Sequence, residues 1–243
     1  MKNERPFLLV NINNTNTSFA LANSRRLLRI VKVPTASVQD IPFTRAGISG
    51  IVLSSVVPGV AKRLRHVLPT RPLVVGADID LGIGVRYPNK KQIGADRLAN
   101  AVGVAELYGA PAIVVDFGTA VTFDILSARS EYVGGVIAPG LASVTDYLYQ
   151  RTALLPRIKL AEPKSVIGKS TIAAMRVGAV VGYRGLVKEI LHALKRERGM
   201  RRAVVVATGG YGDLIAKKIP EIEHVNPLLT LEGLRFIYLR NRH

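Results

Sequence analysis

The sequence contains no cysteine, no tryptophan and only three methionines, and its 17 acidic residues are outnumbered by 34 basic ones. Without cysteine, the chain has no disulfide bonds, no thiolate catalysis and no cysteine-ligated zinc. The four histidines (66, 192, 224 and 243) lack the spacing of metal ligands, so we assign them structural or solvated roles. No apolar stretch approaches membrane-spanning length, and no membrane partner is expected.

The N-terminus shows no export signal. Residues 1–5 lead into an apolar run that is too short for a signal peptide, so we expect a cytoplasmic protein. Apolar residues make up 48% of the 243 residues, a composition typical of a folded globule of one large or two small domains.

The net charge of +17 attracts polyanions and small anions such as ATP alike. No motif of stacking aromatic residues accompanies the basic clusters, so a solvated surface is favoured over a nucleic-acid site. The clusters are Arg25, Arg26 and Arg29; Lys62, Arg63 and Arg65; and Lys195, Arg196, Arg198, Arg201 and Arg202.

A hairpin pattern near the middle of the chain points to phosphate chemistry. The apolar run 112–115 predicts a buried strand, Asp116 lies at its end, and Gly118 and Thr119 form the turn before a second strand to Leu126. Turn amides and the hydroxyl suit phosphate oxygens, while the carboxylate suits a metal ion or its water. Taken alone, the same residues are also ordinary turn formers.

The N-terminus repeats this pattern. Strand-like residues 7–10 are followed by segment 11–16, which is polar except for Ile12, and by a second strand, 17–21. Two such hairpins, roughly a hundred residues apart, predict a duplicated fold with two phosphate-facing loops, and hence a nucleotide site.

The remaining pattern alternates strands with helices, which is typical of an α/β fold. We expect strands at 27–33, 51–53, 72–75, 132–137 and 204–207, and helices at 58–68, 94–108, 141–153, 171–197 and 231–239. The segment 168–171 resembles the end of a P-loop, but the required upstream glycine and strand are absent, so Thr171 is interpreted as a helix start. Gly209 and Gly210 would let the backbone pass close to a flat ligand such as adenosine.

Asp96 and Arg97 fall in the first turn of the helix that begins at Gly94. A carboxylate there can stabilise the helix by a few tenths to about 1 kcal/mol through the helix dipole. It can equally be a reactive group at the mouth of a cleft, and the phosphate hairpin that follows the helix favours this second interpretation.

Seven ordered motifs carry a family resemblance. They are the first hairpin; Y-x-N from Tyr87 with G-A-D-R-x-x-N-A-V from Gly94; D-x-G-T-A-x-T-F-D from Asp116; G-G-x-I-x-P-G from Gly134; G-x-S-T from Gly168; A-T-G-G from Ala207; and L-x-L-E-G-L-R from Leu229. Over nearly its whole length the chain resembles the type III pantothenate kinases, or Bvg accessory factor family, of the acetate kinase, sugar kinase, Hsp70 and actin superfamily.

The resemblance implies a duplicated actin-like α/β fold. Residues 1–110 would form the N-terminal half with the first phosphate hairpin. Residues 111–243 would form the C-terminal half with the second hairpin and the adenosine-side glycines. The implied reaction is ATP-dependent phosphorylation of pantothenate to 4'-phosphopantothenate, the first step of coenzyme A biosynthesis, by a homodimer that uses Mg²⁺ and a potassium or ammonium ion.

The resemblance also implies residue roles. Asp96 would be the catalytic base and Asp116 the ligand of the monovalent cation. Pantothenate would be bound by Tyr87, Gly94, Ala95, Asp96, Arg97 and Thr171. ATP would be bound by Asn11, Ile12, Asn13, Asn14, Thr15, Asn16, Thr17, Ser18 and Thr119.

The first hairpin departs from the family, whose members carry D-x-G-N-T where this chain has Asn11 to Thr15. Asn11 lacks the charge that would hold Mg²⁺ through water, and Asn13 adds a side chain where the family has glycine. Two alternatives therefore stay open. One is a pseudokinase, a nucleotide-binding regulatory protein without turnover, and the other is a nucleic-acid-associated regulator that uses the basic surface.

Overall fold

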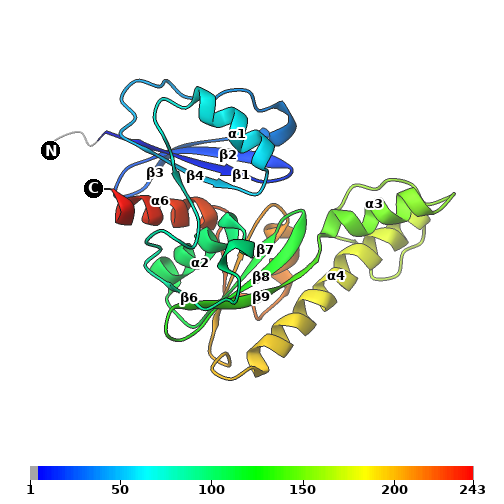
Figure 1. Cartoon of the computed structure of the whole chain (residues 1–243). Helices are drawn as coiled ribbons and strands as arrows, with labels where there is room; N and C mark the ends of the chain where they lie inside the picture. Colours follow the sequence, from blue (N-terminus) through cyan, green and yellow to red (C-terminus); the bar gives the residue numbers. More distant parts are fainter. Residues whose placement is uncertain (1–4, 243) are drawn as a thin grey trace. The chain divides into compact units, whose positions relative to one another are not determined.

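The computed structural model describes residues 5–242 (Figure 1). Residues 1–4, which belong to the N-terminal run interpreted above, and His243 lie outside the described residues. The chain forms two compact units: unit 1 comprises Met1–Gly109, Arg129–Val133 and Leu228–His243, and unit 2 comprises Ala110–Ala128 and Gly134–Pro227. Between residues 5 and 242, no helix is both long enough and apolar enough to cross a membrane.

Unit 1 is built on a five-stranded mixed sheet in the order β3-β2-β1-β4-β5. The first three strands form an antiparallel meander, and β4 and β5 run parallel to β1. The elements of unit 1 are β1 (Phe7–Ile12), β2 (Asn16–Ala22), β3 (Leu27–Pro34), η1 (Thr35–Ser37), β4 (Ile51–Ser55), α1 (Pro58–Val67), β5 (Leu73–Val74), β6 (Gly84–Val85), η2 (Lys90–Gln92), α2 (Ala95–Tyr108) and α6 (Leu229–Asn241).

The two faces of this sheet bury different residues because side chains alternate along a strand. Val10, Leu53 and Phe19 belong to a core cluster that also contains Val60 and Leu64 of α1. The alternate positions face the other way, where α2 packs on β4, and α6 packs on β1 and β4. This second face positions α2.

Unit 2 repeats the strand order. The second sheet has six strands in the order β11-β10-β7-β8-β9-β6, in which β8 is antiparallel to β7, and β10 and β11 run parallel to β7. The predicted duplicated α/β fold is therefore confirmed, since five strands of the second sheet repeat the order of the first and β6 is added at its edge. The elements are β7 (Ala112–Phe117), β8 (Ala120–Leu126), β9 (Glu131–Pro139), α3 (Leu141–Arg151), α4 (Thr171–Arg196), β10 (Val204–Thr208), α5 (Gly212–Ile215), η3 (Ala216–Lys218) and β11 (His224–Val225).

One strand bridges the division of the chain. The first residues of β9 belong to unit 1, where β6 pairs with them in parallel, Gly84 opposite Glu131 and Val85 opposite Tyr132. The C-terminal helix α6 also belongs to unit 1. Division of the chain into the halves 1–110 and 111–243 remains a proposal. The two compact units are defined by which residues pack together, whereas the halves concern which segments arose by duplication.

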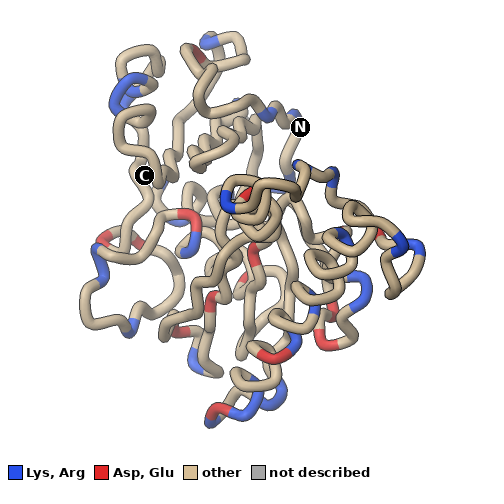
Figure 2. Tube along the Cα trace, turned by 90° about the vertical axis from the view of Figure 1, so that its right-hand side faces the viewer, with Lys and Arg blue, Asp and Glu red and all other residues tan. Residues whose placement is uncertain are grey.

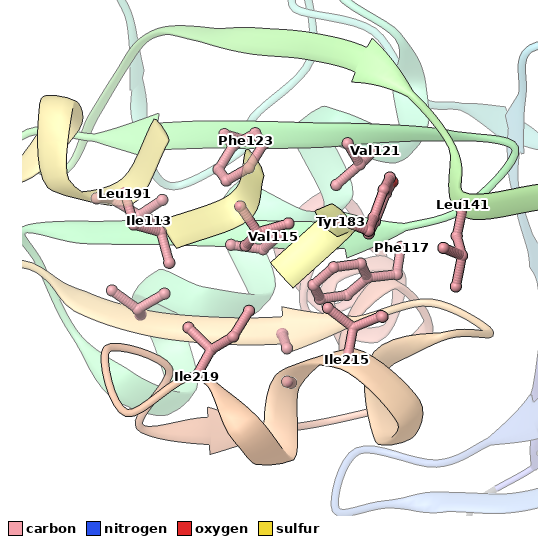
Figure 3. Close-up of a cluster of buried hydrophobic side chains, with 14 of the residues drawn as sticks. Ile113, Val115, Phe117, Val121, Phe123, Leu141, Tyr183, Leu191, Ile215 and Ile219 are labelled. Atoms are coloured by element: carbon pink, nitrogen blue, oxygen red, sulfur yellow. The ribbon is translucent and has the colours of Figure 1, made fainter. Parts of the chain in front are cut away.

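The core of unit 2 fills one face of its sheet (Figure 3). Val115 and Phe117 of β7 and Val121 and Phe123 of β8 point into this cluster, together with Tyr183 of α4. Their neighbours Val114, Asp116, Thr122 and Asp124 therefore face the other side of the sheet. The hydroxyl of Tyr183 donates to the carbonyl of Pro139 at 3.1 Å, which ties the end of β9 to α4.

The basic residues are spread along the chain with acidic residues among them (Figure 2). The run 195–202 is the end of α4 and the loop after it, as predicted. Two of its cations have acidic partners, Lys195 with Glu223 at 3.8 Å and Arg196 with Glu189 at 3.6 Å. The Arg196 pair is exposed and the Lys195 pair is partly exposed, which is typical of a solvated surface.

Candidate functional site

Asp96 lies in the first turn of α2, where the structure places it as predicted. Its Oδ1 accepts a hydrogen bond from the backbone N–H of Arg97 at 2.9 Å. A side chain at position 94 would meet this oxygen at 2.6 Å, so Gly94 makes room for the carboxylate. Burial raises the pKa of Asp96, and the N–H and the charge of Arg97 only partly oppose this shift. A desolvated carboxylate of this kind is suited to accept a proton.

Arg97 and Tyr87 meet at Tyr132, within unit 1. The guanidinium carbon of Arg97 lies 5.8 Å from the centre of the Tyr132 ring, and the rings of Tyr87 and Tyr132 are 6.2 Å apart. Tyr132 is fully buried. Its fixed ring holds both neighbours, and a cation over a ring face is attracted to it. Sequence analysis missed Tyr132, since only the pairing of β9 with β6 brings it to this site.

Helix α6 holds α2 by close backbone contact. A side chain at position 233 would collide with the carbonyl of Ala99, and one at position 103 would meet the carbonyl of Leu229 at 2.7 Å. Beside this crossing, the hydroxyl of Thr230 donates to Oδ1 of Asn100 at 2.7 Å. The C-terminal motif L-x-L-E-G-L-R is therefore a packing motif that fixes the helix carrying Asp96.

The first hairpin, which joins β1 to β2, is clamped by Thr35. The Thr35 hydroxyl donates to the carbonyl of Asn13 at 2.6 Å and contacts the Thr17 hydroxyl at 3.0 Å. The Thr35 N–H donates to the carbonyl of Thr15 at 3.0 Å. These hydrogen bonds use the backbone carbonyls of Asn13 and Thr15, so the asparagine side chains of the turn are not needed to hold its shape. Thr35 is a second residue that sequence analysis missed, because nothing in its local pattern marks this contact.

Asn13 fits the turn without backbone strain. Ser130 is the single non-glycine residue with a positive φ between residues 5 and 242, so Asn13 does not need the left-handed conformation that glycine would allow. The Oδ1 atoms of Asn11 and Asn13 are buried, with no hydrogen-bond partner among the described residues.

The second hairpin, between β7 and β8, lies within unit 2 and carries Asp116 and Thr119. Its backbone is packed tightly against two glycines. A side chain at position 140 would collide with the carbonyl of Thr119, and one at position 209 would meet Oδ1 of Asp116 at 2.5 Å. Gly209 also has a φ of +87°, which favours glycine. The requirement for glycine at 209 thus comes from the hairpin itself, whereas a side chain at Gly210 would meet no described atom within 4 Å.

Thr171 belongs to unit 2 and is the first residue of the long helix α4. Ser170 caps this helix, since its Oγ accepts from the N–H of Ala173 at 3.2 Å. The prediction of a helix start in place of a P-loop is confirmed. Thr171 is exposed beside a helix N-terminus, a position where partial positive charge favours anionic groups.

The side chains present fit a magnesium ion that is held mainly by phosphates and water. No group of three or more histidine or acidic side chains that could enclose a metal occurs among residues 5–242. The unpartnered oxygens of Asn11 and Asn13 are acceptors, and the water molecules around Mg²⁺ are donors. Mg²⁺ commonly keeps several waters and few protein ligands.

The family pattern and the individual relatives that match this sequence point to the same family. The family pattern of type III pantothenate kinases matches residues 7–193. A type III pantothenate kinase from Akkermansia muciniphila is 52% identical over 234 residues, which cover 94% of this chain and 96% of that protein. One from Methylacidiphilum infernorum is 41% identical over 235 residues, covering 95% and 87%.

Solved structures share the fold. A conserved Baf family protein from Campylobacter jejuni superposes with a TM-score of 0.66 at 20% identity, covering 97% of this chain and 98% of that one. The activator of 2-hydroxyisocaproyl-CoA dehydratase from Clostridium difficile superposes with a TM-score of 0.51 at 12% identity, covering 97% and 94%. At these identities the likeness concerns the fold alone.

Proposed function

The chain belongs to the type III pantothenate kinase family, and from this premise we propose how its residues share one phosphoryl transfer. It is a kinase that uses ATP to phosphorylate pantothenate to 4'-phosphopantothenate, the first step of coenzyme A biosynthesis. The observation that carries the assignment of roles is Asp96, a half-buried carboxylate with a raised pKa in the first turn of α2.

In the proposed reaction, the primary hydroxyl oxygen of pantothenate attacks the γ-phosphorus of ATP. The bond from that phosphorus to the β–γ bridging oxygen breaks, and ADP leaves. Asp96 accepts the hydroxyl proton, a contribution typically of ~10²–10⁴-fold in rate. Bound Mg²⁺ would supply neutralisation of the phosphate charge. The rest of catalysis is positioning of the two reactants.

Pantothenate is an anion with a carboxylate at one end. The Arg97 guanidinium offers a fork of donors that suits a carboxylate, and Tyr132 holds it in place. We assign Tyr87, Gly94, Ala95 and Thr171 to the same substrate, the last through its place at the start of α4.

We assign ATP to the two hairpins. The turn of the first hairpin (residues 11–18), clamped by Thr35, and Thr119 of the second would donate to phosphate oxygens. The coupled assay that tests the proposal measures ADP formation with and without pantothenate. Formation that requires pantothenate supports the proposal, whereas formation that ignores it does not.

The monovalent cation is assigned to Asp116, the second-to-last residue of β7, beside the packed turn at Gly118. We expect turnover in potassium or ammonium to exceed turnover in sodium at matched ionic strength by at least about tenfold. This factor corresponds to ~1.4 kcal/mol of extra stabilisation from the contact between the preferred ion and the carboxylate. Asp116→Asn should remove this preference, and steady-state rates in the three salts measure it. Equal turnover in all three for the wild type would remove the cation role from Asp116.

We propose a homodimer that forms through unit 2. Large apolar side chains are exposed at the end of β9, on α3, in the loop after it and at the start of α4. They include Ile137, Tyr147, Leu154, Val166 and Ile167, of which Leu154 is 89% exposed. An exposed apolar set of this extent is typical of a surface that associates with another chain, and a second copy is the partner the family implies.

Light scattering after gel filtration tests the dimer. Wild type should elute with the mass of two chains, and Ile167→Asp should elute with the mass of one at micromolar concentration, because a charge placed in an apolar interface loses its water. Leu28→Asp, at an exposed apolar position of β3 in unit 1, is the control and should keep the mass of two chains. A single-chain mass for the wild type would contradict the proposal.

We assign the basic surface to solvent and to the attraction of anionic substrates, and we place the reaction in the cytoplasm. A nucleic-acid partner is the less favoured alternative. Salt-steep DNA affinity that ignores pantothenate would support it.

A further inference from the structure

Three polar side chains lie in one row across the sheet of unit 1. Ser18 of β2 and Ser54 of β4 are both register partners of Asn11 of β1. Partners in register point to the same face of a sheet. This is the face opposite the Val10, Leu53 and Phe19 cluster, where α2 and α6 pack. The row lies at the edge of the sheet where β1 leads into the turn of the first hairpin.

Two members of the row are buried without partners. Asn11 is 4% exposed and Ser54 is 0% exposed. Neither Oδ1 of Asn11 nor Oγ of Ser54 has a hydrogen-bond partner among residues 5–242, so the two are not bonded to each other. A buried polar atom left unpaired destabilises a protein, and such atoms in native proteins commonly have a role.

The second sheet carries the same row. Asp116 of β7 is the register partner of Thr122 on β8 and of Thr208 on β10. These strands correspond to β1, β2 and β4 in the duplicated order. Each unit therefore presents a hydroxyl, a central acid or amide, and a second hydroxyl at the end of its central strand. Ser54 corresponds to Thr208, and Asn11 corresponds to Asp116.

The unpartnered atoms indicate what they bind. Oδ1 of Asn11 is an acceptor, Oγ of Ser54 has acceptor capacity, and Oδ1 of Asn13 in the adjacent turn is a third acceptor. Phosphate oxygens are acceptors too, so ATP phosphates alone leave the two amide oxygens unpaired. Water molecules bound to a cation present only donors outward. A hydrated magnesium ion on the nucleotide therefore fits this set better than phosphate does.

We propose that Ser54 acts with Asn11 as a neutral seat for the water shell of the magnesium ion that accompanies ATP. Ser54 is thus a positioning residue of the nucleotide site. This inference rests on the proposed binding of ATP by the first hairpin. It also implies that the ligand-free protein carries the cost of the unpaired hydroxyl, which metal-loaded nucleotide relieves.

The test compares Ser54→Ala with wild type by calorimetric binding of a non-hydrolysable ATP analogue, with Mg²⁺ and with EDTA. Ser54→Ala should weaken binding about tenfold with Mg²⁺ and leave binding in EDTA unchanged, since it removes one hydrogen bond to the ion's water. The melting temperature of the ligand-free variant should rise by roughly 2–4 °C, because the unpaired hydroxyl is gone.

Ser55→Ala is the matched control. The Ser55 hydroxyl contacts the carbonyl of Val57 at 3.2 Å and accepts from its N–H at 3.0 Å, so it has a structural role. This variant should melt lower and keep the wild-type dependence on Mg²⁺. If Ser54→Ala melts lower as well, or weakens binding equally with Mg²⁺ and EDTA, Ser54 is a structural hydroxyl or holds an ordinary buried water, and the proposal is overturned.

Asn11→Asp gives an independent readout. A carboxylate in the row should lower the Mg²⁺ concentration needed for half-maximal analogue binding by about tenfold. An unchanged Mg²⁺ requirement would overturn the seat. Binding is measured without turnover, so the outcomes separate. If the wild type shows the metal-dependent binding but never phosphorylates pantothenate, the magnesium seat is supported and the proposed function is contradicted. If it phosphorylates pantothenate but lacks the metal-dependent binding, the proposed function is supported and the seat is overturned.

Discussion

Asp96→Asn is expected to lower kcat by at least ~10²-fold and to leave ATP affinity nearly unchanged, because it removes the proton acceptor and not the nucleotide hairpins. The amide keeps the size of the carboxylate and its capacity to accept from the Arg97 N–H. Steady-state kinetics with both substrates varied, and calorimetry with the ATP analogue, measure the two quantities. Near-normal turnover in this variant would remove Asp96 from the chemistry.

The pH dependence follows from the direction of the pKa shift. The pKa of Asp96 is raised in the folded protein, chiefly by burial. The group therefore stabilises the fold below its unfolded pKa, and this contribution is lost as pH rises through the folded pKa. At neutral pH the variant should melt no lower than wild type. The base must be ionised to act, so kcat of the wild type should rise with pH through the same raised pKa.

Stability separates this role from the alternative. If Asp96 served only to stabilise the start of α2, asparagine would cost a few tenths to about 1 kcal/mol of stability at neutral pH and leave kcat unchanged. The catalytic assignment predicts the reverse on both counts.

Gly233→Ala is expected to destabilise the protein by about 1–3 kcal/mol or more, because its new methyl group collides with the carbonyl of Ala99 where α6 crosses α2. Each kcal/mol corresponds to a melting temperature about 2–4 °C lower in a chain of this size. Helix α2 carries Asp96, so kcat should fall together with stability. Thermal unfolding and kinetics on the same preparation measure both.

Gly185→Ala is the matched control for that variant. Gly185 is an exposed glycine within α4, and a side chain there would meet no described atom within 4 Å. Alanine should therefore stabilise the protein by roughly 0.4–1 kcal/mol. If both variants behaved alike, the contact between α6 and α2 would not be the reason for the glycine in the C-terminal motif.

Local sequence patterns predicted the longer strands, the two hairpins and the start of α4, because each depends on neighbouring residues, but they missed the two-residue strands β6 and β11. Alternating or continuous apolar runs predict strands, and the missing upstream glycine and strand marked Thr171 as a helix start and not as part of a P-loop. The duplication of the fold was likewise predicted from two hairpins with the same pattern, although the strand order of the sheets was not. These features need no knowledge of which distant segments meet.

The features that sequence analysis missed depend on distant partners. Tyr132 reaches Tyr87 and Arg97 only because β9 begins beside β6. The row of Asn11 and Ser54 appears only once the register of β1 and β4 is known. Gly209 was interpreted through a ligand, but its nearest constraints are Oδ1 of Asp116 and the backbone of Phe117 in the second hairpin. In each case the sequence shows the residue type, but it does not show which distant residue that side chain contacts in the fold.

The departure of Asn11 from the family pattern makes one measurement decisive. Wild-type protein is incubated with ATP, Mg²⁺, potassium and pantothenate, and 4'-phosphopantothenate and ADP are quantified by mass spectrometry. A working kinase with a neutral magnesium seat should form the two in equal amounts, at a rate that keeps rising with Mg²⁺. No 4'-phosphopantothenate at saturating ATP and Mg²⁺, in a protein that still binds the nucleotide, would contradict the account and identify a nucleotide-binding protein without turnover.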